Sequence, residues 1–114
     1  MVGARGEAAA CRVLTARGYR ILARNVRSRA GELDLVCHDG DAFVFCEVKA
    51  RRPSHFGAPQ EALSATKQAR LARLASAYLA RIGRAGAPWR VELVAVELDA
   101  HAEPSGVEVV PVWY

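Results

Sequence analysis

The spacing of apolar and polar positions predicts two helices and five strands. Apolar residues three and four apart predict a helix over residues 7–17, which ends at Gly18, and a longer helix within 60–82, where Ser64 is a suitable N-cap. Alternating segments predict strands over 19–26, on both sides of a turn at Asp39 and Gly40, and over 91–98 and 107–113, the last two separated by a turn at 104–106. The predicted class is α/β, in the order αβββαββ.

The segment from Gly31 to Lys49 is the most informative because apolar and polar residues alternate on both sides of its turn. A two-residue turn at Asp39 and Gly40 pairs His38 with Asp41, and a four-residue loop is expected to give the same pairing. This register sets Glu32 opposite Glu47 and Asp34 opposite Phe45. Side chains two apart share a strand face. The polar face then carries Glu32, Asp34, Glu47 and Lys49, and the core face carries Leu33, Leu35, Val44, Cys46 and Val48.

Three carboxylates on one face need a compensating cation, which is Lys49, a bound metal ion, or both. Carboxylate oxygens are the usual ligands of Mg²⁺, which keeps several waters and also binds substrate phosphate oxygens. An ammonium two residues after Glu47 lies beside such a metal and stabilises charge on a phosphoryl group or positions the nucleophile. The pattern therefore predicts a site for phosphodiester hydrolysis.

The alternative is a solvated polar face with one salt bridge. Phe43 and Phe45 alternate onto that same face, and a fully exposed face seldom carries two aromatic residues. We therefore expect the polar face to be half covered.

The order of short motifs resembles the YraN family of small bacterial proteins. The motifs are a helical Glu7, GELD at 31–34, FCEVKAR at 45–51, FGAPQEAL at 56–63, and Lys67. That family is placed in the PD-(D/E)XK, or restriction-endonuclease-like, nuclease superfamily, so the resemblance implies a central mixed sheet flanked by helices. One departure is Arg90-Val91-Glu92, where family members usually have Arg, an aromatic residue and Asp.

The resemblance also implies roles for individual residues. It matches Asp34 to the superfamily's metal-binding aspartate, Glu47 and Lys49 to its (D/E)XK pair, and Glu7 to an acidic residue on the first helix of resolvase-like enzymes. The predicted catalytic residues are thus Asp34, Glu47 and Lys49. The predicted ligands of Mg²⁺ or Mn²⁺ are Asp34, Glu47 and Glu7, with Glu32 as an additional acidic residue nearby.

The predicted function is metal-dependent hydrolysis of DNA, with structured or branched DNA as the favoured substrate. The first alternative is a non-catalytic nucleic-acid-binding protein that retains the nuclease fold, and the second is a protein-interaction module. Resolvase-like enzymes often act as dimers, so the resemblance is compatible with a homodimer.

Charge supports a polyanionic partner. Sixteen Lys and Arg against twelve Asp and Glu give a net charge of +4, and the basic residues gather on both sides of the acidic segment. The alternative is that arginine serves only solubility. The residues predicted to bind nucleic acid are Arg51, Arg52, Lys67 and Arg70.

Length and composition set the remaining expectations. A chain of 114 residues with 52% hydrophobic residues is the size of one domain spanning 1–114. We expect a soluble, cytoplasmic protein, because neither an apolar run of about 20 residues nor a secretory signal is apparent. The three cysteines lack CxxC spacing, so we expect reduced thiols, and the histidines lack the spacing of a zinc site.

Overall fold

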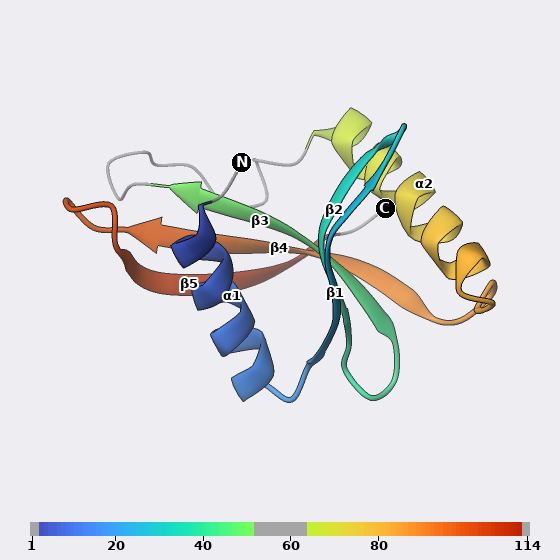
Figure 1. Cartoon of the computed structure of the whole chain (residues 1–114), viewed down its shortest axis with the longest axis horizontal. Helices are drawn as coiled ribbons and strands as arrows, with labels where there is room; N and C mark the ends of the chain where they lie inside the picture. The colour runs from blue at the N-terminus through green and yellow to red at the C-terminus, as the bar shows by residue number, and fades with distance from the viewer. Residues whose placement is uncertain (1–2, 52–63, 113–114) are drawn as a thin grey trace.

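The computed structural model describes residues 3–51 and 64–112, which form a five-stranded sheet with one helix packed on each face (Figure 1). The helices are α1 (Ala4–Ala16) and α2 (Ala65–Arg81), and the strands are β1 (Arg20–Ser28), β2 (Gly31–His38), β3 (Phe43–Arg51), β4 (Trp89–Leu98) and β5 (Pro104–Val112). The predicted α/β class, with a central mixed sheet flanked by helices, is confirmed. Neither described helix is long and apolar enough to span a membrane.

The strands lie in the sheet in their order along the chain, from β1 to β5. Strands β3 and β4 are parallel, and the other three pairs are antiparallel. A parallel pair needs a crossover connection, and α2 lies within the segment that joins these two strands. This arrangement brings the first turns of α2 over the middle of the sheet, beside β2.

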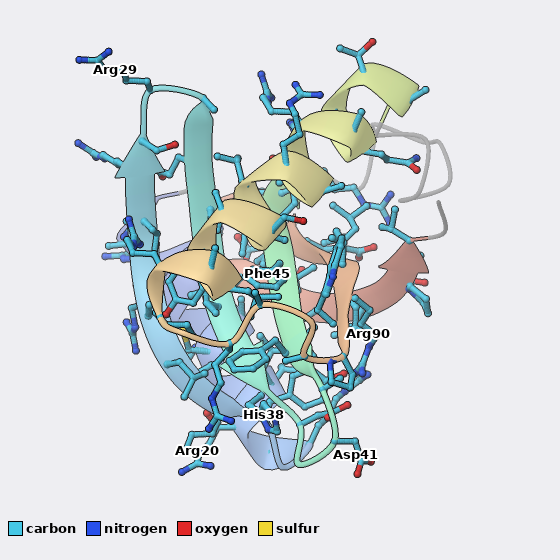
Figure 2. All side chains as sticks on the ribbon, turned by 90° about the vertical axis from the view of Figure 1, so that its right-hand side faces the viewer. Arg20, Arg29, His38, Asp41, Phe45 and Arg90 are labelled. Carbon is cyan, nitrogen blue, oxygen red and sulfur yellow. The ribbon has the colours of Figure 1, made fainter. Side chains whose placement is uncertain are left out.

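The hydrophobic core on the α2 face is built around Phe45, which is fully buried between that helix and the sheet (Figure 2). Its ring makes edge contacts with Tyr78 and Trp89, at centroid distances of 5.9 and 6.0 Å. Leu71, Leu74 and Leu79 of α2 fall at helical spacing and are buried in the same cluster. The second helix is capped by the Ser64 hydroxyl, which accepts from the Lys67 backbone N–H at 3.1 Å, so the predicted N-cap is confirmed.

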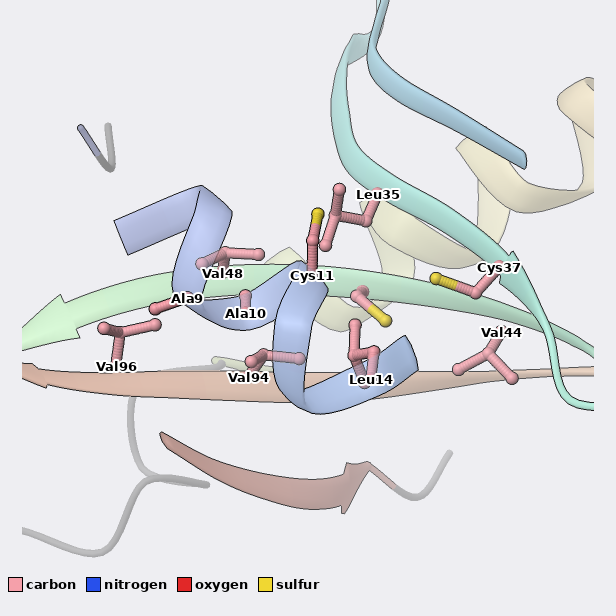
Figure 3. Close-up of a cluster of buried hydrophobic side chains, with 11 residues drawn as sticks. Ala9, Ala10, Cys11, Leu14, Leu35, Cys37, Val44, Val48, Val94 and Val96 are labelled. Atoms are coloured by element: carbon pink, nitrogen blue, oxygen red, sulfur yellow. The ribbon is translucent and has the colours of Figure 1, made fainter. Parts of the chain in front are cut away.

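The core on the α1 face is separate and lies between that helix and strands β2, β3 and β4 (Figure 3). Ala10 and Leu14 of α1 pack against aliphatic residues such as Val44 and Val94, and all four are completely buried. The three cysteines are buried free thiols, as the sequence predicts. Two cores on opposite faces hold the sheet in place and leave its central strands inaccessible except near their ends.

The predicted register of β2 and β3 is wrong by two residues. His38 pairs with Phe43 rather than Asp41, and Leu35 pairs with Cys46. The connection is therefore a four-residue loop, 39–42, in which the Asp39 carboxylate accepts from the backbone N–H groups of Asp41 and Ala42, both at 2.8 Å. This side chain stabilises the longer loop. A shift of two residues keeps every β3 side chain on its predicted face, because faces alternate with a period of two.

One core residue lies on the other face from the one predicted. Leu35, Val44, Cys46 and Val48 belong to the α1-side core as expected, but Leu33 is buried in the α2-side core. Pairing between β2 and β3 ends at Leu35 and Cys46, and the first residues of β2 pair only with β1. A two-stranded ribbon twists more than an interior strand, and the β1–β2 ribbon turns away from β3 toward α2 (Figure 1).

The turn between β4 and β5 also differs from the prediction. It lies at residues 99–103, whereas the predicted turn at 104–106 is the start of β5. The Asp99 carboxylate accepts from the N–H groups of His101 and Glu103, at 2.8 and 3.0 Å. An aspartate side chain stabilises this turn as Asp39 stabilises the β2–β3 loop, and the turn comes earlier than Pro104 and Gly106 suggest.

A polar cluster joins three distant parts of the chain at the end of the sheet next to the β2–β3 loop. The Arg90 guanidinium contacts Asp39 at 2.6 Å, Tyr19 at 2.9 Å and Glu92 at 3.2 Å. The Tyr19 hydroxyl donates to the other oxygen of Glu92 at 2.8 Å. Glu92 is only 5% exposed. Its charge is therefore neutralised inside the fold, so the Arg90-Val91-Glu92 segment has a structural role.

We predict that Arg90→Met lowers the free energy of unfolding by about 2 kcal/mol, because it leaves the Glu92 and Asp39 carboxylates without their cation. Urea unfolding followed by circular dichroism measures this loss. Arg73→Met on the exposed side of α2 is the matched control and should change stability by less than about 0.5 kcal/mol. Equal losses in both variants would contradict a structural role for the cluster.

Candidate active site

A polar pocket of about 420 Å³ opens where β2 separates from β3, under the first turns of α2. Its charged lining residues are Glu32, Asp34, Glu47, Lys49, Lys67 and Arg70. They come from β2, β3 and α2, so no single element could form the pocket. Gly31 starts β2 at a φ of 142°, and a Cβ there would lie 3.4 Å from Leu74 and 3.5 Å from Arg70. These distances are ordinary van der Waals contacts, so the positive φ, and not the approach of α2, favours glycine at this position.

Asp34 lies at the point of separation. Its Oδ2 accepts from the backbone N–H of Val48 at 2.8 Å. Asp34 is one residue beyond Leu35, and Val48 is two residues beyond Cys46, the last pair of β2 and β3. Burial raises the pKa of this carboxyl from 3.8 to about 6, with Glu47 and Glu32 adding to the increase and the Val48 hydrogen bond opposing it. The site thus holds a carboxylate whose charge the surrounding protein does not fully compensate.

Glu47 and two lysines share the pocket with Asp34. The Lys67 ammonium lies 2.8 Å from Glu47 Oε1, and the two side chains are only 22% and 12% exposed. The pKa of Lys49 is lowered mainly by contact with the Lys67 ammonium and by burial, against the opposing effect of Glu47 and Asp34. Two cations and two carboxylates are therefore packed closely enough to perturb one another.

The other predicted acidic residues lie differently. Glu32 lines the pocket, but its carboxylate accepts from Arg27 at 2.9 Å. Glu7 lies on α1, which covers the other face of the sheet, and its carboxylate is 3.9 Å from Arg24. Within residues 3–51 and 64–112, no group of three or more His, Cys, Asp or Glu side chains is placed to hold a metal ion. A metal here would rely on Asp34 and Glu47.

The residues predicted to bind nucleic acid are also distributed unevenly. Lys67 and Arg70 line the pocket. Arg51 lies at the end of β3, 3.2 Å from Glu97 and 3.8 Å from Glu108, so its charge is balanced by carboxylates of β4 and β5. Arg52 lies outside the described residues.

The contact between Lys67 and Glu47 is absent from the sequence-based interpretation, although the sequence contains two signals for it. Lys67 lies four residues before Leu71 and seven before Leu74, so it extends the buried stripe of α2. Moreover, only two of the sixteen basic residues are lysine, and both line this pocket. Because the other basic residues are all arginine, the two lysines indicate positions where a compact ammonium fits better than a planar guanidinium.

The fold and pocket define a class: a small α/β protein with a mixed sheet and a polar pocket that contains acidic residues and lysines. A family model described as "Uncharacterised protein family UPF0102" matches residues 6–96. The UPF0102 protein of Symbiobacterium thermophilum is 58% identical over 96 residues, which are 84% of this chain and 81% of that protein. The UPF0102 protein of Moorella thermoacetica is 48% identical over 105 residues, 92% of this chain and 88% of that protein.

The chain belongs to the UPF0102 family, and the resemblance to the YraN family is thereby confirmed. The family's description states no activity, so the function has to be argued from the pocket.

The raised pKa of Asp34 predicts that Asp34→Asn stabilises the metal-free protein. Between the ordinary pKa of 3.8 and the folded value of about 6, the folded state holds the proton more tightly, so stability falls as pH rises. Asparagine does not ionise. In EDTA at about pH 7.5, we expect a gain of roughly 1–3 kcal/mol in the free energy of unfolding, which disappears near pH 4.

Denaturant unfolding at the two pH values measures this gain. Glu32→Gln is the control, because Glu32 is paired with Arg27, and it should produce no gain. An Asp34→Asn variant that is less stable than wild type near neutral pH would show that the carboxylate is fully compensated.

Proposed function

We propose that this protein is a metal-dependent nuclease of the restriction-endonuclease-like type, which hydrolyses phosphodiester bonds of DNA with Mg²⁺ or Mn²⁺. The observation that carries the proposal is the convergence of Asp34, Glu47 and Lys49 in one pocket. The three side chains come from two strands, and they supply hard oxygen ligands beside an ammonium.

The carboxylates present suit such an ion. Mg²⁺ is usually held by one or two carboxylates together with waters and substrate phosphate oxygens, so Asp34 and Glu47 are sufficient. Among the described contacts, Val48 engages one oxygen of Asp34 and Lys67 one oxygen of Glu47, which leaves each carboxylate a second oxygen. The raised pKa of Asp34 also fits, because a divalent cation would compensate this buried charge.

When bound, the metal supplies Lewis acidity to the phosphoryl oxygen and lowers the pKa of a coordinated water. The protein's own residues orient the ligands and stabilise the developing charge. Asp34 is oriented by the Val48 N–H, and Glu47 is fixed on the rigid central strand β3. Lys49 stabilises the charge that develops on the phosphoryl oxygens or positions the attacking water.

The charge around the pocket favours a polyanionic substrate. Lys67 and Arg70 stand at the pocket on α2, and Arg29 projects from the tip of the β1–β2 hairpin (Figure 2). A backbone phosphate placed at Lys49 would therefore meet the cations of α2 in the same pocket. The resemblance to resolvase-like enzymes extends the proposal to branched DNA and to a homodimer. The buried free thiols fit a reducing, cytoplasmic compartment.

A non-catalytic nucleic-acid-binding protein is the second candidate. The observation that favours it is the ion pair between Lys67 and Glu47, because this ammonium already neutralises one of the two carboxylates without a metal. Metal binding and cleavage distinguish the two candidates.

Metal binding is tested by isothermal titration. We expect Mn²⁺ and Mg²⁺ to bind the wild type, and the Asp34→Ala, Glu47→Ala double variant to lose at least about tenfold in affinity, since it removes both ligands. Glu7→Ala should retain binding, because Glu7 is paired on the other face of the sheet. The metal proposal fails if the double variant binds as well as the wild type.

Cleavage is tested with labelled single-stranded, duplex, flap and four-way-junction DNAs in Mn²⁺. We expect Lys49→Ala to reduce cleavage by about 100-fold or more while DNA retention in Ca²⁺ changes by less than about threefold. Arg12→Ala on the exposed side of α1 is the control and should cleave like the wild type. DNA retention without cleavage by the wild type on every substrate would instead establish the non-catalytic candidate.

A further inference from the structure

The ion pair between Lys67 and Glu47 involves a carboxylate that the proposed metal would also use. Lys67 Nζ lies 2.8 Å from Glu47 Oε1, inside a pocket that also contains Asp34. A divalent ion bound between Asp34 and Glu47 would stand next to this ammonium, with strong repulsion at such a distance in a partly buried site. Glu47 has a second oxygen for the metal, but the two cations would repel each other across its carboxylate, so each would weaken the other's contact.

A second ammonium makes the position of Lys67 still less stable once a metal arrives. Lys49 lines the same pocket as Lys67, two residues after Glu47 on β3, so the two ammonium groups repel each other there. The attraction of the Glu47 carboxylate keeps the Lys67 ammonium in place despite repulsion from Lys49. A metal bound to Glu47 would weaken the attraction of Glu47 for Lys67, while Lys49 would continue to repel Lys67.

We propose that Lys67 is an exchangeable internal cation: it neutralises Glu47 in the metal-free protein, and it moves to a phosphate of the nucleic acid when a divalent metal takes its place. The inference rests on the proposed function and adds an order of events to it. It also gives both lysines of the chain a role in the same pocket.

The local structure allows the side chain to move alone. The backbone of Lys67 is fixed in the first turn of α2, where its N–H donates to the Ser64 hydroxyl. The ammonium is carried on a flexible four-carbon stem with rotatable donors, unlike the planar guanidinium of arginine. Arg70 lines the pocket one helical turn further on, so a phosphate that receives Lys67 has a second cation beside it.

The exchange couples the metal to the nucleic acid. Metal binding releases Lys67 for a phosphate, and a phosphate that holds Lys67 frees Glu47 for the metal. Each ligand therefore raises the affinity for the other, as reciprocity between linked sites requires. Without nucleic acid, the Lys67 ammonium competes with the divalent ion for Glu47, so the metal binds more weakly than it does when a phosphate holds Lys67.

The first test is the affinity for Mn²⁺ alone, measured by electron paramagnetic resonance of the free ion. Lys67→Met removes the competing ammonium and should tighten Mn²⁺ binding by about five- to tenfold. Arg70→Met is the matched control, since it removes one positive charge from the same pocket but leaves the ion pair of Glu47, and we expect a change below about twofold.

The second test observes Lys67 in the wild-type protein, and a variant is needed only to assign its signal. Protein labelled with ¹⁵N in the lysine side chains gives signals from two ammonium groups only, Lys49 and Lys67. Lys67→Arg assigns them. We expect the Lys67 signal to lose its protection from exchange with water when Mg²⁺ is added, because the contact with Glu47 ends.

The outcomes separate this inference from the proposed function. Unchanged or weaker Mn²⁺ binding in Lys67→Met, or a Lys67 signal that Mg²⁺ does not alter, overturns the exchange while the metal site stands. If Asp34→Asn combined with Glu47→Gln binds Mn²⁺ like the wild type, the metal site itself is wrong and both proposals fall.

Discussion

The structure depends on one hydrogen bond at the point where two central strands separate. Pairing of β2 and β3 ends at Leu35 and Cys46, and the next carboxylate, Asp34, accepts from the backbone of Val48. A side chain thus satisfies a backbone donor that a continued ladder would have satisfied. Because the strands part there, β2 can twist toward α2, and the space that opens becomes a pocket whose wall is the polar end of β3.

Two groups of buried charges in this small fold contrast in how well they are compensated. Around Arg90, every named carboxylate and hydroxyl has a partner, and the group joins β4 to the β2–β3 loop. Around Asp34, burial outweighs the available compensation, and the pKa rises to about 6. The neutralised Glu92 therefore belongs to a stabilising network, whereas the uncompensated Asp34 marks the candidate functional site.

The sequence predicts most of the elements and the residues of the pocket, because alternation and helical spacing are local. The Ser64 cap, the stripe through Leu71 and the shared face of Glu47 and Lys49 all follow from such patterns. The strand register does not, because the side chain of Asp39 selects a longer loop than the Asp-Gly pair suggests. Leu33 lies on the face opposite to the predicted one because pairing of β2 with β3 ends at Leu35, and local alternation does not reveal where pairing ends.

The contact between Lys67 and Glu47 depends on how α2 crosses the sheet, and no local sequence pattern specifies that crossing. The basic character of Lys67 suggests a surface residue, yet the helix carries it into contact with Glu47. Two predicted acidic site residues show the opposite outcome, because the fold pairs them with other side chains. Glu7 and Glu32 match the motif pattern, but the fold pairs each of them with an arginine. Motif spacing identifies candidate residues, whereas the packing of α1 and α2 decides which of them meet.

The most direct measurement is anomalous diffraction at the manganese absorption edge from a crystal soaked in Mn²⁺. We predict a strong peak within coordination distance of the carboxylates of Asp34 and Glu47, with the Lys67 ammonium displaced. Density that shows Lys67 still on Glu47, and no manganese between the two carboxylates, would contradict it.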